Sequence, residues 1–183
     1  LICKDFIPIV KYLRTLNPKL RIGAHTNASL RNTQFFTEIA SLLNFLGFGI
    51  DGLEDTNHLY RRNCKWEKVI NNVQAFISAG GHAEWDFCVF KHNQHQVEQA
   101  KTLSKELGFS KFNIKKTVRF FTYEHKLVDY IDVRNNKGEV EYQLEQPSDE
   151  RYINQAYKDL EQTDLDKYIK NTCRIKTSRV QIT

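Results

Sequence analysis

A regular alternation of helix and strand patterns over residues 1–117 is the feature that most constrains the fold. Strands are expected at 21–27, 48–53, 83–90 and 111–117, and a segment with helical periodicity separates each strand from the next. The spacing of about 30 residues is the length of a strand followed by a crossover helix. The sequence therefore predicts an α/β fold in which the strands run parallel and are joined by right-handed crossovers.

Helices are expected at about 5–16, 33–46, 66–78 and 95–107, because apolar residues recur there every three or four positions. The second of these helices ends just before Gly47, and glycine is the commonest residue directly after a helix. The sequence thus places Gly47 outside the strand that follows.

The strands alternate between apolar and polar residues, which determines what each face of the sheet contacts. We expect one face to meet the helices through Ile22, Ala24, Phe48, Ile50, Trp85, Phe87, Val89, Phe112 and Ile114. The opposite face then carries Gly23, His25, Asn27, Gly49, Asp51, Glu84, Asp86, Cys88, Asn113 and Lys115. In a flat doubly wound sheet, helices cover both faces and the central strands are apolar throughout. The alternation favours a partial (β/α) TIM-like barrel with helices on its outer face, and a flat sheet is the alternative if a strand shifts by one residue.

The pattern changes in the last third of the chain. Residues 130–144 alternate around a turn-forming Asn-Asn-Lys-Gly segment, which predicts a β-hairpin. A polar helix is expected at about 149–161. We therefore divide the chain into a partial barrel at 1–120 and a hairpin with a helical linker at 121–183, leading toward a further C-terminal module.

The composition is typical of one soluble globular domain, with 183 residues, 40% hydrophobic and 27% charged. No apolar stretch is long enough to cross a membrane, and no leader pattern is present, so we expect a cytoplasmic protein without a membrane partner. The net charge of +5 favours acidic or phosphate-bearing partners, but the basic residues are too dispersed to predict nucleic-acid binding.

Four cysteines are scattered along the chain, at Cys3, Cys64, Cys88 and Cys173. None has a second cysteine at the spacing of a zinc or redox motif, so free thiols in a reducing compartment are expected and no metal ligand is assigned. The chain contains no methionine and begins with Leu1. We interpret it as an internal fragment of a longer protein.

Polar residues at the carboxyl ends of the strands are the candidates for a binding site, because barrels of this kind carry their chemistry there. Asn27, Asp51, Asp86 and Lys115 would lie at these ends. Aspartate accepts hydrogen bonds from hydroxyls or an ammonium, asparagine donates and accepts, and lysine pairs with a carboxylate. An ordinary polar residue at a strand end explains Asn27 and Asp51 equally well, and it is the favoured explanation for Asp86 and Lys115.

Other polar residues carry weaker signals. The histidines at 25, 58, 92 and 95 lack partners at metal-binding spacing and are expected to be solvated or to cap helices. Arg61 and Arg62 are expected to be surface charges, with contact to an anionic substrate as the alternative.

Four segments resemble one enzyme family. Residues 25–32 (His-Thr-Asn-Ala-Ser-Leu-Arg-Asn) resemble the Thr-Asn-Gly turn after the third strand of radical S-adenosylmethionine enzymes. Residues 50–62 (Ile-Asp-Gly-Leu-Glu-Asp-Thr-Asn-His-Leu-Tyr-Arg-Arg) and 66–73 resemble the Ser-Ile-Asp-Gly strand, His-x-x-Tyr-Arg loop and Val-Ile-x-Asn-Val helix of the branch with SPASM-type C-terminal modules. Residues 86–93 resemble the fifth strand and its trailing asparagine. The resemblance covers about 1–120, or strands three to six of a six-strand partial barrel.

The resemblance implies a fold, cofactors and a reaction. It implies binding of S-adenosylmethionine and a 4Fe-4S cluster, an electron donor, and hydrogen-atom abstraction from a small-molecule or peptide substrate that the sequence does not identify. It assigns cofactor binding to Thr26, Asn27, Asp51, Asp86 and Lys115, whose side chains suit the ammonium, carboxylate and ribose of S-adenosylmethionine. It assigns no catalytic residue.

The sequence also departs from the family pattern. The Cys-x-x-x-Cys-x-x-Cys loop that holds the cluster and the Gly-Gly-Glu segment that meets the cofactor's amino group are both absent. Gly49 replaces a common serine, and Ala28 replaces the usual glycine. Cys173 resembles the first cysteine of a SPASM-type module, with a free thiol as the alternative. The fragment alone is expected to be inert, and a non-redox, barrel-like phosphate- or nucleotide-binding module is the alternative function.

Overall fold

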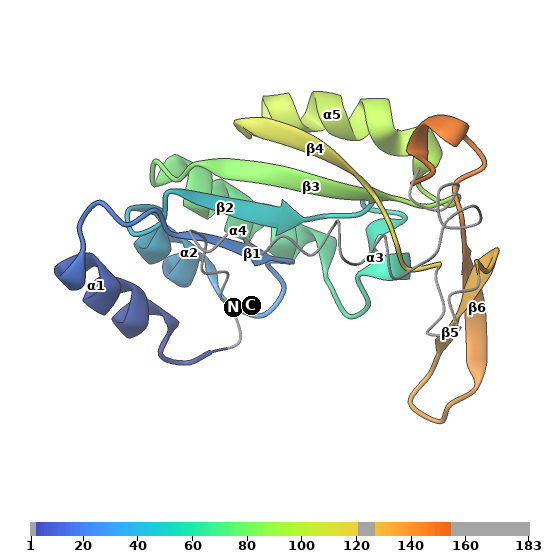
Figure 1. The fold of residues 1–183 in the computed structure, drawn as a ribbon, viewed down its shortest axis with the longest axis horizontal. Coiled ribbons are helices and arrows are strands. Elements are labelled where there is room, and N and C mark those ends of the chain that lie inside the picture. Colours follow the sequence, from blue (N-terminus) through green and yellow to red (C-terminus); the bar gives the residue numbers. More distant parts are fainter. Residues whose placement is uncertain (1–2, 121–126, 155–183) are drawn as a thin grey trace, which may run out of the picture.

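The computed structural model describes residues 3–120 and 127–154, and its main element is a four-stranded parallel sheet (Figure 1). The strands are β1 (Gly23–Thr26), β2 (Phe45–Gly49), β3 (Ala83–Val89) and β4 (Lys111–Lys116). They lie side by side in the order of the chain, β1-β2-β3-β4, and every neighbouring pair is parallel. The predicted α/β class and the parallel sheet are confirmed.

Helices connect the strands and pack on one face of the sheet. They are α1 (Phe6–Leu16), α2 (Thr33–Ala40), α3 (Asn57–Tyr60), α4 (Trp66–Ser78) and α5 (Val97–Glu106), with short 3₁₀ turns η1 (Gln94–Gln96) and η2 (Glu150–Tyr152). α2, α4 and α5 lie against the same face, while α1 packs beside α2 at the β1 end and α3 follows β2 (Figure 1). The core between sheet and helices is rich in aromatic rings: Phe36, Phe48, Phe76, Trp85 and Phe87 are all at most 1% exposed.

The predicted alternation is clearest in β3. Trp85, Phe87 and Val89 face the helices and are 0% exposed, whereas Glu84, Asp86 and Cys88 between them are half-buried on the other face. Ile114 was expected on the buried face but is 41% exposed, because β4 is the edge strand of the described sheet.

The second strand begins earlier than predicted. The expected helix 33–46 ends at Ala40, and the strand expected at 48–53 covers Phe45–Gly49, so Gly47 lies inside the strand. The apolar run from 42 to 48 fits both a helical and an extended period, and pairing with β1 and β3 decides between them. Asn44 fixes the start of the strand, since its side-chain oxygen accepts hydrogen bonds from Ile22 N at 2.7 Å and from Arg14 Nη2 at 2.9 Å.

A β-hairpin packs at the carboxyl end of the sheet and forms a second core. β5 (Tyr130–Arg134) and β6 (Val140–Glu145) pair antiparallel, as predicted, and lie beyond the carboxyl end of β3 (Figure 1). The second core consists of Phe90, Phe120 and Leu144, each at most 6% exposed. Of the helix expected at 149–161, the turn η2 is seen, and the part beyond residue 154 lies outside the described residues.

Among the described residues, no helix has the length and apolar character that crossing a membrane would require.

Candidate functional site

The sheet face turned away from α2, α4 and α5 carries polar side chains that converge on Asp86. His25 Nδ1 on β1 lies 3.2 Å from Asp86 Oδ2, and Lys115 Nζ on β4 lies 3.2 Å from Asp86 Oδ1. Asn113 Nδ2 donates to Asp86 Oδ1 at 2.9 Å and to Glu84 Oε2 at 3.0 Å. The Asp86 side chain is 13% exposed, while His25 and Lys115 are 56% and 50% exposed. A ligand arriving from solvent would therefore meet the histidine and the lysine first.

Gly47 allows His25 to reach across the sheet. In the strand register His25 pairs with Gly47, and Gly47 pairs with Glu84 on β3. A Cβ on Gly47 would overlap the His25 imidazole ring. The missing side chain thus leaves space for the ring to cross β2 and contact Asp86.

A buried ion pair lies beyond the end of β2. The Asp51 side chain is 1% exposed, its Oδ2 accepts from Arg61 Nε at 2.5 Å, and its Oδ1 accepts from Cys88 N at 2.6 Å. Burial raises the pKa of Asp51, and the Arg61 guanidinium and the Cys88 N–H oppose that rise. The Arg61 guanidinium lies over Gly49, where a Cβ would overlap it. Gly47 and Gly49, two residues apart on one strand face, thus each make room for a side chain from elsewhere.

Buried amide side chains fix the loop that carries this arginine. Asn57 Oδ1 accepts from Asp51 N at 2.9 Å, and Asn93 Nδ2 donates to Asp51 O at 2.8 Å. Gln96 Oε1 accepts from Leu53 N at 3.1 Å. The three amide residues are at most 4% exposed. Their buried hydrogen bonds therefore hold the loop backbone in one conformation.

An aromatic ring joins the ion pair to the second core. Arg61 Cζ lies 5.1 Å and Arg119 Cζ lies 5.4 Å from the centroid of the Tyr60 ring. The same ring packs on Phe90, with centroids 4.5 Å apart. The nearby Cys88 thiol stays protonated, because burial and the Asp51 charge raise its pKa to about 11.

The structure places three of the five predicted cofactor-binding residues in these two arrangements and the other two at the end of β1 and in the turn that follows it. Asp86 and Lys115 contact each other on the polar face, and Asp51 lies beneath Arg61 with both carboxylate oxygens engaged. Asn27 Oδ1 accepts from Ser29 N and Ser29 Oγ at 3.2 and 2.9 Å, which leaves its amide N–H groups without a partner among the described residues. Thr26 alternates with His25 and uses its hydroxyl to accept from Ala28 N at 3.0 Å.

Sequence reasoning missed the contacts of His25 and Arg61. His25 was expected to be solvated or capping; it is 56% exposed, and nothing in the sequence indicated that it also pairs with Asp86. Arg61 was expected at the surface, yet it is 30% exposed and pairs with a buried carboxylate. The sequence feature that could have indicated these contacts is the pair of glycines at 47 and 49. Because they have no side chains, they leave space on the polar face for side chains from other segments.

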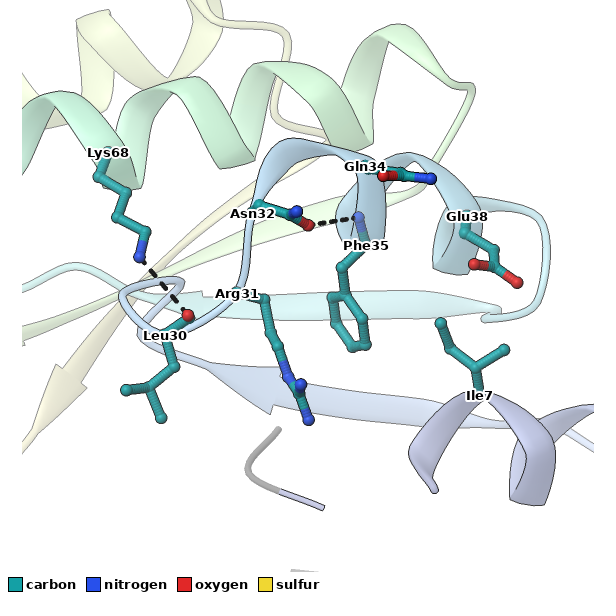
Figure 2. A pocket seen from close by; sticks show the side chains of 8 residues that line it. All are labelled: Ile7, Leu30, Arg31, Asn32, Gln34, Phe35, Glu38 and Lys68. Carbon is teal, nitrogen blue, oxygen red and sulfur yellow. Dashed lines mark hydrogen bonds between the residues drawn. The ribbon is translucent and has the colours of Figure 1, made fainter. Parts of the chain in front are cut away.

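A separate hollow of about 420 Å³ lies on the helix side of the molecule, between α1, α2 and α4 (Figure 2). Several of its polar groups are already engaged: Asn32 Oδ1 accepts from Phe35 N at 3.1 Å, and Lys68 Nζ donates to Leu30 O at 3.5 Å (Figure 2). Glu38 pairs with Lys11 at 2.7 Å. The hollow therefore brings no uncommitted reactive groups together.

The described residues do not fit an iron–sulfur cluster. Cys3 is exposed, Cys64 is buried and Cys88 is half-buried, and they occupy different elements. Within residues 3–120 and 127–154, no three histidine, cysteine or acidic side chains are grouped to hold a metal ion. Cys173 lies outside the described residues.

No protein-family model matches this chain, and no curated protein matches it. Any assignment of function therefore rests on the residues and their geometry.

Proposed function

We propose that this chain is the central part of a radical S-adenosylmethionine enzyme of the SPASM-linked branch. The observation that carries the proposal is the polar sheet face, on which His25, Asp86, Asn113 and Lys115 meet on the side away from the helices. A partial barrel needs a face of this kind as the lining of its interior.

The order of the strands supports a barrel wall over a doubly wound sheet. Strands that follow one another in the chain are neighbours throughout the sheet, and the helices between them pack on one face. In doubly wound folds the strand order reverses and helices cover both faces. The described strands would then be strands three to six of the partial barrel.

The turn after β1 adds local support. Ala28 adopts φ +55°, in the left-handed region where glycine is the default residue. This is the position at which the family's Thr-Asn-Gly turn has its glycine. The backbone thus adopts a conformation that suits the family residue better than the alanine.

The polar residues suit the groups that S-adenosylmethionine presents. Lys115 would meet a carboxylate, Asp86 an ammonium, and the unengaged amide N–H groups of Asn27 a ribose hydroxyl or carboxylate. Both carboxylate oxygens of Asp51 are already engaged, by Arg61 Nε and by Cys88 N. In this conformation Arg61 would contact the ligand, and Asp51 would position Arg61. The chemistry supplied by the cofactor is hydrogen-atom abstraction after its reductive cleavage. We derive no step through the cluster, since the described residues do not hold one.

The test is to express the complete reading frame that contains this chain and reconstitute it without oxygen, with iron and sulfide. The proposal predicts a three-cysteine loop upstream, a cluster absorption band, and formation of 5′-deoxyadenosine from S-adenosylmethionine upon reduction. A complete reading frame without that loop would contradict the proposal and favour the non-redox binding module.

A further inference from the structure

The Tyr60 ring holds two guanidinium groups at the carboxyl end of the sheet. Arg61 comes from the end of α3 and Arg119 from the segment after β4, yet their Cζ atoms lie 5.1 and 5.4 Å from the same ring centroid. Two cations at one ring repel each other, so an arrangement of this kind is favoured when a negative charge joins them.

Among the described residues, the positive charge at this place is incompletely balanced. Asp51 neutralises Arg61 through the buried ion pair. Arg119 is exposed, and among the described residues no carboxylate pairs with it. Of the groups named, two are positive and one is negative, which leaves one positive charge facing solvent.

Hydrogen-bond donors are also left over. Arginine has five N–H donors, and Asp51 takes only the Nε–H of Arg61. The Nη groups of Arg61 and the whole Arg119 guanidinium have no acceptor among the described residues. A planar guanidinium fork matches the oxygen pairs of carboxylates and phosphates.

The first arginine is held in place before any ligand arrives. The Asp51 pair fixes Nε, Gly49 leaves room beneath the guanidinium, and the amides of Asn57 and Asn93 fix the loop. A donor that is already immobilised loses little conformational entropy on binding.

We propose that Arg61 and Arg119, held against Tyr60, form an oxyanion-binding site that takes a carboxylate or phosphate group of a ligand. This inference does not depend on cleavage of S-adenosylmethionine, and the site would serve a substrate anion in either function considered above.

The experiment is a titration of the 183-residue chain with inorganic phosphate, followed through the arginine Nε–H signals by NMR at constant ionic strength. Parallel titrations with acetate and with S-adenosylmethionine distinguish a phosphate, a carboxylate and the cofactor's own carboxylate as the source of the anion. We expect saturable shifts of the Arg61 and Arg119 signals with at least one of the three.

Arg119→Gln is the test variant, because this side chain is exposed and its loss should leave the fold intact. Removal of one charge-assisted contact should weaken binding about tenfold. Arg134→Gln is the matched control: it removes an exposed arginine that pairs with Asp132 on the hairpin, and it should leave the affinity unchanged. Tyr60→Phe, which keeps the ring, should also retain binding.

Two results would overturn the proposal. One is the absence of any saturable shift with all three anions. The other is an equal loss of affinity in Arg119→Gln and Arg134→Gln, which would show that anion binding depends on the net charge of the protein and not on this site.

Discussion

His25 on β1 contacts Asp86 on β3, two strands away, with its Nδ1 3.2 Å from a carboxylate oxygen. The contact crosses Gly47 of β2, where any side chain would occupy the position of the imidazole. A residue without a side chain in the middle strand thus determines which polar groups of the outer strands meet.

Gly47→Ala should separate these two side chains. The new methyl group overlaps the ring, and His25 is 56% exposed, so the imidazole can turn into solvent instead of straining the sheet. We expect a stability change within about 1 kcal/mol, since alanine is also the better strand residue. The His25 ring signals in NMR spectra should shift toward those of His25 in an Asp86→Asn variant. Unchanged ring signals in Gly47→Ala would contradict the described contact.

Two adjacent arginines should differ sharply in their importance for stability. Arg61→Gln leaves the Asp51 carboxylate buried without its partner and should lower the free energy of unfolding by about 3–5 kcal/mol. Arg62 pairs with Glu141 at the surface, with both side chains 38% exposed, and Arg62→Gln should produce no measurable change. Denaturant unfolding of both variants checks this prediction.

The contribution of the Asp51–Arg61 ion pair to stability can also be tested by a substitution that changes neither charged residue. Gly49→Ala places a methyl group on the Arg61 guanidinium and should destabilise the protein more than Gly47→Ala does, because Arg61 is held by a buried partner. Equal effects of the two alanines would indicate that Arg61 is free to move.

Features of the fold that depend on neighbouring residues in the sequence were predicted correctly, and features that depend on contacts between distant residues were predicted less well. The alternation in β3 is a local pattern, and it correctly assigned Trp85 to the helix face and Asp86 to the polar face. The start of β2 was wrong by three residues because the preceding apolar run suits two periods, and only pairing with β1 and β3 selects one.

The site depends on non-local contacts and was predicted less well. The residues of the polar face were assigned only from the alternation of side chains along each strand. The contacts among His25, Asp86 and Lys115 depend in addition on how three strands align. The burial of Arg61 depends on a loop whose path is fixed by Asn93 and Gln96, about 40 residues later in the chain. No periodicity within the loop carries that information.

His92 should make stability depend on pH. Both of its ring nitrogens are buried, and neither has a hydrogen-bond partner among residues 3–120 and 127–154. Burial, with smaller contributions from His95 and His58, lowers the pKa of His92 from 6.5 to about 4. The unfolded chain therefore takes up a proton at a pH where the folded chain does not. The free energy of unfolding should fall as the pH drops from about 6.5 to 4, and this contribution should level off below that range.

The size of this effect should be ~1–2 kcal/mol, less than the full pKa difference implies, because the ring is only partly buried. His92→Phe keeps the stacking on Phe90 and should remove the dependence in this window. Urea unfolding at several pH values measures it, and identical pH profiles for the two proteins would show that the His92 ring is accessible to water.

Two tyrosines of the hairpin, one hydrogen-bonded to α3 and one exposed, allow a test of how the hairpin is held against the rest of the protein. The Tyr142 hydroxyl donates to Leu59 O at 2.5 Å, which joins β6 to α3, whereas Tyr130 on β5 is 51% exposed. Tyr142→Phe should cost about 0.5–1.5 kcal/mol, and Tyr130→Phe should cost nothing measurable. If thermal unfolding shows no difference between them, the hairpin does not depend on this contact.

The cofactor proposal makes its sharpest prediction at Asn27, in the complete parent protein. The Asn27 amide N–H groups are unengaged among the described residues, while its oxygen is used within the turn. Asn27→Ala should therefore remove one hydrogen bond to S-adenosylmethionine, at a cost of ~1–3 kcal/mol or about 5- to 150-fold in affinity. Asn27→Asp keeps the turn but removes the donors, and it should weaken binding at least as much. Glu67→Ala, on the exposed face of α4, is the control and should bind the cofactor as the parent does. Calorimetric titration of S-adenosylmethionine into the reconstituted protein measures all four affinities, and equal values for the parent, Asn27→Ala and Asn27→Asp would remove this residue from the cofactor site.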